Sequence, residues 1–223
     1  MIKAMIFDMD GVLIDSVRTG LQVRKQLLAN YGVDLDTVPD PQGEGHRAAS
    51  LKTLLTSVEK HSGVHVDHEE FKQLSQKHMY QQLKNSGAAA DPALVSLLKE
   101  LRRHDILCAI TSSSLQESVD NKLKILGIKP YFSVIITGSD AQEHKPHPEG
   151  YLLTLAKLRL SPNQCIIVED TKTGVEAGLA AGCRVIGFTQ YNPSRETLEG
   201  TIANIAHWHD LTYETLVKLD TKS

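Results

Sequence analysis

The hydrophobic positions of the chain fall into short runs, and longer stretches with apolar residues at helical spacing separate them. The runs are too short for helices and are bounded by turn residues, as is typical of buried strands. Strands that alternate with helices favour a parallel sheet with right-handed crossovers. The five predicted strands cover residues 4–7, 106–110, 134–137, 165–168 and 185–188. The pattern therefore predicts a layered α/β fold.

Helix boundary signals support this pattern. Asp91 and Pro92 supply an N-cap and a first-turn proline before ALVSLLKELRRH, in which four leucines form one apolar stripe. Two further predicted helices, LQESVDNKLKIL and TGVEAGLAA, end at Gly127 and Gly182. Glycine at these positions suits a left-handed helix C-cap.

The first crossover is unusually long, because about 90 residues separate the first predicted strand from the second. Within this gap, residues 17–31, 46–60 and 68–84 have helical patterns and no strand-like run occurs. We therefore expect an all-helical cap domain at 17–86, inserted into a Rossmann-like, doubly wound parallel sheet core formed by 1–16 and 87–223.

Composition and charge exclude several classes of protein. Lys and Arg number 24 against 27 Asp and Glu, so a net charge of -3 gives no basic surface for nucleic acid. The apolar runs are far shorter than the roughly 20 residues that span a bilayer. No signal peptide pattern is present, and three widely spaced cysteines in apolar surroundings fit buried thiols. We expect a cytoplasmic monomer that binds neither nucleic acid nor a membrane.

Polar residues follow four of the predicted strands. They are Asp8 and Asp10 after the first strand, Thr111, Ser112 and Ser113 after the second, Lys145 after the third, and Glu169 and Asp170 after the fourth. The carboxyl ends of parallel strands lie at one edge of a sheet, where ligands bind near the topological switch point. Carboxylates from distant segments suit Mg²⁺, and a lysine with hydroxyls beside the ion suits a phosphate group. The hydroxyls and free backbone N–H groups of Ser112 and Ser113 are expected to hold phosphoryl oxygens.

Each segment also has an ordinary structural interpretation. Hydroxyls after a strand are usually helix N-caps, a Lys-Pro pair is usually a surface turn, and acids before a helix favour its dipole. Their joint occurrence at successive strand ends favours chemistry. One carboxylate of the first pair could attack phosphorus while the other exchanges protons.

Four segments, FDMDGVLIDS, ITSSS, HKPHPEGY and VEDTKTGVEAGLAAG, resemble in this order the signature segments of the haloacid dehalogenase-like (HAD) hydrolases. The chain looks like the helical-cap branch that contains β-phosphoglucomutase and phosphoglycolate phosphatase. The resemblance implies that Asp8 is the nucleophile and Asp10 the general acid and base. Lys145 would bridge the nucleophile and the phosphate.

The resemblance also implies a metal site and a phosphate-binding hydroxyl. Asp8, Asp170 and the backbone carbonyl of Asp10 would hold Mg²⁺, with Glu169 as a further ligand, direct or through water. Thr111 and Ser112 both fit the position of the hydroxyl; serine-rich family variants favour Ser112, with Ser113 beside it.

The cap segment bears on which reaction occurs. Mutase-like sequences commonly have Glu-Pro-Leu-His after the first motif, where this chain has Val17, Arg18, Thr19 and Gly20. The difference favours a phosphatase for a small phosphorylated metabolite, with a sugar phosphate as the leading class and a β-phosphoglucomutase-like mutase as the alternative. Arg47, in GEGHRAAS, resembles a residue of the cap loop that often recognises an anionic group. A phosphate-binding module without catalysis is a third possibility.

Overall fold

The computed structural model describes residues 1–40, 46, 51–192 and 197–221. The chain divides into two compact units: Met1–Asp15 with Ala88–Ser223, and Ser16–Gly87. We call them the α/β unit and the helical unit, and each is described by itself. None of the helices in the described ranges has the length and apolar character needed to cross a bilayer.

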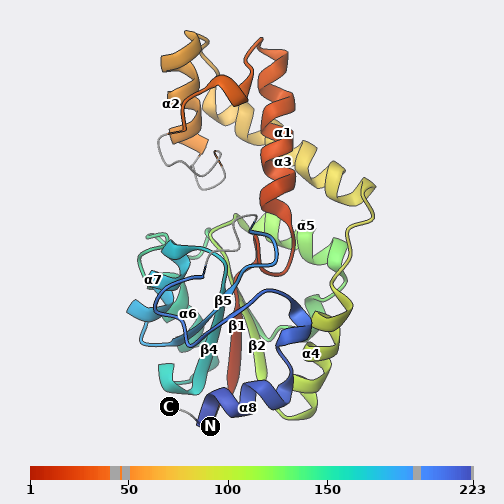
Figure 1. Ribbon diagram of the computed structural model, residues 1–223, viewed down its shortest axis with the longest axis vertical. Helices are drawn as coiled ribbons and strands as arrows, with labels where there is room; N and C mark the ends of the chain where they lie inside the picture. Colours follow the sequence, from red (N-terminus) through yellow and green to blue (C-terminus); the bar gives the residue numbers. More distant parts are fainter. Residues whose placement is uncertain (41–45, 47–50, 193–196, 222–223) are drawn as a thin grey trace. The chain divides into compact units, whose positions relative to one another are not determined.

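The α/β unit contains a six-stranded sheet in which all neighbouring strands are parallel, in the order β3-β2-β1-β4-β5-β6 (Figure 1). The strands are β1 (Ala4–Phe7), β2 (Leu107–Thr111), β3 (Val134–Ile136), β4 (Cys165–Glu169), β5 (Arg184–Phe188) and β6 (Ala203–Ile205). The chain moves outward from β1 through β2 to β3, then returns to place β4 on the other side of β1. The topological switch point therefore lies between β1 and β4.

The described part of this unit contains the α-helices α4 (Pro92–Arg103), α5 (Gln116–Leu126), α6 (Glu149–Leu158), α7 (Lys172–Ala180) and α8 (Tyr213–Thr221). Short 3-10 helices lie at Lys129–Tyr131, Pro162–Gln164 and Trp208–Asp210. Helices α6 and α7 lie on one side of the sheet and α4 on the other (Figure 1). The α/β class and the parallel sheet are thus confirmed.

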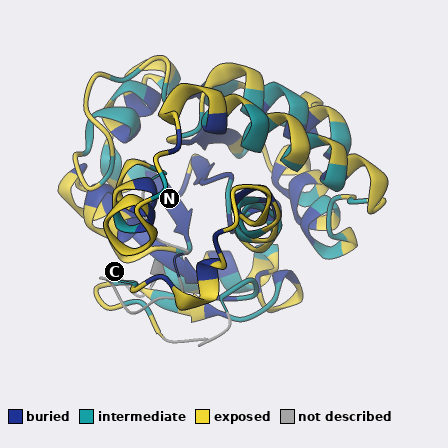
Figure 2. Cartoon of the chain, turned by 90° about the horizontal axis from the view of Figure 1, so that it is seen from above, coloured by how far each residue is buried: buried dark blue, intermediate teal, exposed yellow. Residues whose placement is uncertain are grey.

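Alternate residues of the strands face opposite layers, as the period of a β-strand requires. Ala4 and Ile6 of β1 and Ile167 of β4 belong to one buried cluster with Tyr151 and Leu155 of α6. Figure 2 shows buried residues along the strands and the inner faces of the helices, with exposed residues on the outer helix faces. The alternation fixes which side of the sheet each strand-end residue approaches.

The helical unit contains α1 (Ser16–Asn30), α2 (Leu51–Ser62) and α3 (His68–Asn85), with a 3-10 turn at Leu35–Thr37. It has its own buried apolar cluster, which includes Val23, Leu28, Leu54 and Phe71. Its described elements are all helical, as the pattern predicted. The assignment of residues 17–86 as a functional cap stays a prediction.

The predicted boundary signals have physical counterparts. The Asp91 side chain accepts a hydrogen bond from the backbone N–H of Ala93 at 2.8 Å and caps α4. Gly127 and Gly182 adopt left-handed backbone angles, with φ of 66° and 80°.

Strand β6 was not predicted, because its three residues Ala203–Ile205 form no apolar run. Cys108, Cys165 and Cys183 are free and buried, as expected.

Candidate active site

The site begins at the switch point, one residue beyond paired positions of β1 and β4. Phe7 pairs with Val168, and the backbone N–H of Asp8 donates to the Val168 carbonyl at 3.0 Å. By strand alternation, Asp8 follows Ile6 and Glu169 follows Ile167 on the face that packs against α6 and α7. The two carboxylates therefore meet on one side of the sheet.

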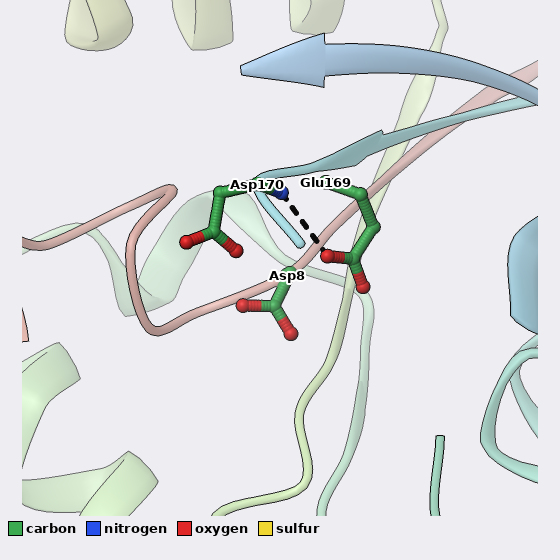
Figure 3. Close-up of side chains that lie close together, drawn as sticks. All are labelled: Asp8, Glu169 and Asp170. Atoms are coloured by element: carbon green, nitrogen blue, oxygen red, sulfur yellow. Dashed lines mark hydrogen bonds between the residues drawn. The ribbon is translucent and has the colours of Figure 1, made fainter. Parts of the chain in front are cut away.

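Asp170 completes a cluster of three carboxylates, and Figure 3 shows the side chains of Asp8, Glu169 and Asp170 gathered together. One oxygen from each residue lies within 4.8 Å of the others. Glu169 is 0% exposed and Asp8 7% exposed. Buried Asp170 Oδ1 has no hydrogen-bond partner among the described residues. An unpaired buried carboxylate oxygen is costly, so the cluster is suited to a cation.

Two glycines make room for these carboxylates. A Cβ on Gly11 would lie 1.8 Å from Asp170 Oδ2, and Gly11 also has a φ of +87°. A Cβ on Gly174, in the first turn of α7, would lie 2.1 Å from the Glu169 carboxyl carbon. Any larger residue at either position would have to displace an acid of the cluster. The glycines after the first and fourth strands are therefore part of the geometry of the site.

Lys145 supplies positive charge to the cluster from the segment between β3 and α6. Its Nζ donates to Asp8 Oδ1, to Glu169 Oε1 at 2.5 Å and to the Thr111 carbonyl at 3.3 Å. The side chain is only 13% exposed. One lysine thus links the ends of β1, β2 and β4.

Burial and mutual repulsion shift the titration of these groups. Burial raises the pKa of Asp8 to about 7, with Glu169 adding to the rise and Lys145 opposing it. Burial and the nearby Asp8 and Glu169 carboxylates also raise the pKa of Asp170 well above its usual value. Burial alone would lower the pKa of Lys145, but Asp8 and Glu169 outweigh it and raise that pKa well above its usual value. One lysine does not neutralise three buried carboxylates, and a bound cation would favour their ionised forms.

Tyr151 of α6 is a member of the site that the sequence analysis missed. Its hydroxyl donates to Glu169 Oε1 at 2.5 Å, and Lys145 Nζ lies 5.1 Å from the centre of its ring. Tyr151 is 1% exposed. Burial and the Glu169 carboxylate raise its pKa well above the usual value, so it is a hydrogen-bond donor. The available signal was a hydroxyl-bearing residue in the first turn of α6, on the buried face that it shares with Thr154 and Leu155.

The three candidate hydroxyls at the end of β2 differ in their hydrogen bonds and their burial. Thr111 lies on the same face as Ala109, and its hydroxyl is hydrogen-bonded to that of Thr154 in α6 at 2.6 Å. The Ser112 hydroxyl accepts from the Ser114 N–H at 3.1 Å, and its own proton has no acceptor among the described residues. Ser113 is exposed. The buried Thr111 hydroxyl is thus already engaged, whereas the Ser112 hydroxyl retains a proton to donate.

One detail of the sequence interpretation is wrong. The backbone N–H groups of Ser112 and Ser113 were both expected to be free for phosphate. The Ser112 N–H donates to the Ile136 carbonyl at 2.9 Å, because the pairing of β2 with β3 continues one residue beyond β2. The Ser113 N–H has no acceptor among the described residues, so it alone of these two amides remains available.

Asp10 is held by residues that the sequence analysis did not single out. Lys122 Nζ donates to Asp10 Oδ1 at 2.5 Å, and the Ser114 hydroxyl donates to Oδ2 at 2.6 Å. Lys122 occupies the buried face of α5, between Val119 and Leu123. A charged residue within an apolar helical stripe was a signal that could have identified it.

The structure therefore gathers Asp8, Lys145, Glu169 and Asp170 at one place, with the loop after β2 joined to them through the Thr111 carbonyl. Asp10 lies two residues beyond Asp8 with its carboxyl paired to Lys122. Arg47 lies outside the described residues. The catalytic and ligand roles assigned to these residues remain predictions.

Comparison with known proteins identifies the family. Residues 5–188 match the haloacid dehalogenase-like hydrolase family. A phosphorylated carbohydrates phosphatase from Thermotoga maritima is 30% identical over 214 residues, which cover 90% of this chain and 93% of that protein. A phosphoglycolate phosphatase from Salmonella typhimurium is 27% identical over 207 residues, 84% of this chain and 81% of its own.

Solved structures agree on the fold. A β-phosphoglucomutase structure from Clostridium difficile has a TM-score of 0.78 and 22% sequence identity, and the match covers 100% of this chain and 98% of that one. At this level of identity the likeness concerns the fold.

Fold and site together define an enzyme of the phosphatase class, a phosphoric monoester hydrolase. The chain belongs to the haloacid dehalogenase-like hydrolase family, as the four sequence motifs indicated.

Proposed function

We propose that this enzyme hydrolyses the phosphate monoester of a small metabolite, with a sugar phosphate as the leading class, through an aspartyl phosphate on Asp8. The observation that carries the proposal is the position of Asp8 at the switch point, in contact with Lys145 and beside Asp170, whose buried Oδ1 is unpaired. The similarity to a phosphatase of phosphorylated carbohydrates supports the substrate class.

In the first half of the proposed reaction, an Asp8 carboxylate oxygen attacks phosphorus. The bond from phosphorus to the leaving oxygen breaks, and Asp10 gives its proton to that oxygen. In the second half, water attacks the phosphorus of the aspartyl phosphate, and the Asp10 carboxylate takes the proton of the water. Inorganic phosphate is released and Asp8 is restored.

The residues around Asp8 are suited to holding the phosphoryl group. Lys145 offers positive charge to both the nucleophile and the phosphate. The Ser112 hydroxyl and the Ser113 N–H are donors on the neighbouring loop that have no acceptor among the described residues. We therefore assign the phosphate-binding hydroxyl to Ser112, with Ser113 beside it and Thr111 as a buried support.

The acidic cluster fits Mg²⁺, because its donors are carboxylate oxygens and Asp170 Oδ1 is buried without a partner. Asp8, Asp170 and the backbone carbonyl of Asp10 would hold the ion, with Glu169 as a further ligand, direct or through water. When bound, Mg²⁺ would offset the negative charge of the phosphoryl oxygens and the nucleophile. Glu169 already accepts bonds from Lys145 and Tyr151, which favours contact through water.

Selection of the substrate is assigned to the helical segment 17–86, including Arg47 as a recogniser of an anionic group. The absence of the mutase-like histidine pattern at 17–20 supports hydrolysis over transfer. The cytoplasmic location and the monomeric state stay predictions from the sequence.

The proposal is tested by phosphate release from a panel of phosphorylated metabolites in the presence of Mg²⁺. We expect sugar phosphates to be hydrolysed faster than other esters. Incubation with β-glucose 1-phosphate separates the two reactions: free phosphate supports the hydrolase, and glucose 6-phosphate would show the alternative mutase. No turnover across the panel, despite Mg²⁺ binding, would favour a phosphate-binding module without catalysis.

Replacing Tyr151 with Phe is expected to weaken the response to Mg²⁺. The hydroxyl orients Glu169, and loss of a residue that orients a metal ligand typically costs about 10–100-fold in metal affinity or activity. The measurement is p-nitrophenyl phosphate hydrolysis against Mg²⁺ concentration. Tyr131→Phe is the matched control, because Tyr131 is half-buried and lies outside the site. An unchanged Mg²⁺ response and an unchanged kcat in Tyr151→Phe would contradict the role.

A further inference from the structure

Lys122 is a buried charge that the proposed reaction does not yet use. It lies on the inward face of α5 together with Val119, Leu123 and Leu126. Its side chain is 3% exposed. A lysine in such a position must be paired, since a lone buried ammonium is very costly. The contacts of Lys122 therefore indicate its role.

Those contacts form a closed triangle around Asp10. Lys122 Nζ lies 2.5 Å from Asp10 Oδ1 and 3.2 Å from the Ser114 hydroxyl oxygen. The Ser114 hydroxyl in turn lies 2.6 Å from Asp10 Oδ2. Each oxygen of the Asp10 carboxyl thus has its own donor. Two donors from separate elements restrict the rotation of the carboxyl group far more than one would.

Stability alone is a poor reason for a lysine at this position. Replacing a buried ion pair with apolar residues of similar size is often neutral or stabilising, and the other buried positions of α5 are apolar. Lys122 also does not reach solvent, whereas the Asp10 side chain is 28% exposed. A substrate can therefore meet Asp10 but not Lys122, and any effect of Lys122 on the reaction passes through Asp10.

We propose that Lys122, assisted by Ser114, is a positioning residue that fixes the Asp10 carboxyl for proton transfer to the leaving group. The inference rests on the proposed role of Asp10 as general acid and base. As the bond from phosphorus to the leaving oxygen breaks, the Asp10 proton moves to that oxygen and a carboxylate remains. The Lys122 ammonium beside Oδ1 stabilises this carboxylate and keeps its orientation.

The proposal predicts a dependence on the leaving group. p-Nitrophenolate leaves readily and needs little help from an acid, whereas phenolate is more basic and needs the proton. Loss of the contacts that hold Asp10 therefore slows the hydrolysis of phenyl phosphate more than the hydrolysis of p-nitrophenyl phosphate. A purely structural defect slows both equally, because it reduces the amount or the general geometry of active enzyme.

The experiment compares Lys122→Met with the wild-type enzyme on phenyl and p-nitrophenyl phosphate, both with Mg²⁺, and measures kcat/KM. This ratio reports the steps up to phosphoryl transfer to Asp8. We expect a fall of about 10–100-fold for phenyl phosphate and less than about threefold for p-nitrophenyl phosphate, within the range that general acid catalysis supplies. Lys124→Met is the matched control, because Lys124 is exposed on the same helix, and we expect no change there.

Folding is checked by the fluorescence of Trp208, the only tryptophan of the chain, which is 1% exposed. If Lys122→Met does not fold, Ser114→Ala removes the other donor, and we expect the same leaving-group dependence with a smaller fall. An equal fall for both substrates, or no fall for either, overturns the proposal.

Asp10→Asn, measured with the same two substrates, distinguishes this inference from the function on which it rests. Wild-type hydrolysis of phenyl phosphate by Asp10→Asn would refute the acid role of Asp10 itself, and the role of Lys122 with it. A leaving-group-dependent fall in Asp10→Asn but not in Lys122→Met would refute only the role of Lys122.

Discussion

Replacing Asp8 with Asn is expected to abolish the magnesium-dependent hydrolysis of p-nitrophenyl phosphate, with kcat falling by at least roughly 10⁴-fold, as when the nucleophile of a covalent mechanism is removed. The amide is a poor nucleophile, and it cannot supply the negative charge that pairs with Lys145. Asn has nearly the shape of Asp, so the backbone bond from Asp8 to Val168 at the end of β1 should persist. The measurement is the steady-state rate with saturating Mg²⁺.

Asp105→Asn is the matched control for this experiment. Asp105 is exposed and has a φ of 55°, a backbone region that Asn tolerates. We expect wild-type activity from this variant. Full retained activity in Asp8→Asn would refute the assignment of Asp8 as the nucleophile, whereas a parallel loss in both variants would point to a general effect of the substitution.

Replacing Gly11 with Ala is expected to disrupt the site through Asp170. The new Cβ would lie 1.8 Å from Asp170 Oδ2, so the carboxylate or the loop must move. Because displacements of about 1 Å in an active site cost on the order of 100-fold in rate, we expect kcat/KM to fall at least that far. The φ of +87° adds a backbone penalty of more than about 1 kcal/mol in the free energy of unfolding. The measurements are p-nitrophenyl phosphate hydrolysis and Mg²⁺ affinity.

Gly127→Ala is the control that distinguishes the steric clash with Asp170 from the backbone penalty of a positive φ. Gly127 has a φ of +66°, and a Cβ there would meet nothing within 4 Å. We expect a similar loss of stability, which is measured through the fluorescence of Trp208. The folded variant should keep wild-type activity and Mg²⁺ affinity. Equal effects of the two substitutions on activity would show that the approach of Gly11 to Asp170 does not matter for catalysis.

Much of the site could be predicted because its residues lie next to strands. Asp8 directly follows an apolar run, as does Glu169 in β4, and parallel strands bring their carboxyl ends to one edge. This local signal predicts that Asp8, Glu169 and Asp170 lie together, and the Lys-Pro motif between β3 and α6 adds Lys145. The family match over residues 5–188 agrees with that convergence.

Other features depended on which face of an element meets which neighbour. The motif at the end of β2 left both Thr111 and Ser112 possible, with Ser112 favoured by the family resemblance. Only the approach of Thr154 from α6 shows that the Thr111 hydroxyl is engaged. The Ser112 N–H, which was expected to be free, donates to the Ile136 carbonyl, because the length of the pairing between β2 and β3 is set by both strands. Strand β6 has too few apolar residues for a sequence pattern to predict it. Its strand conformation accompanies its pairing with β5.

The amino-acid sequence was sufficient to predict the parallel α/β fold, the helical character of the segment after β1, and the set of acids, lysine and hydroxyls at the strand ends. These follow from hydrophobic periodicity and short motifs, which are local properties of the chain. Packing between distant elements brings Lys122, 112 residues from Asp10 in sequence, to the Asp10 carboxyl, and brings the Tyr151 hydroxyl to Glu169. A side chain's partner across the fold depends on packing between distant elements, and no local pattern specifies it.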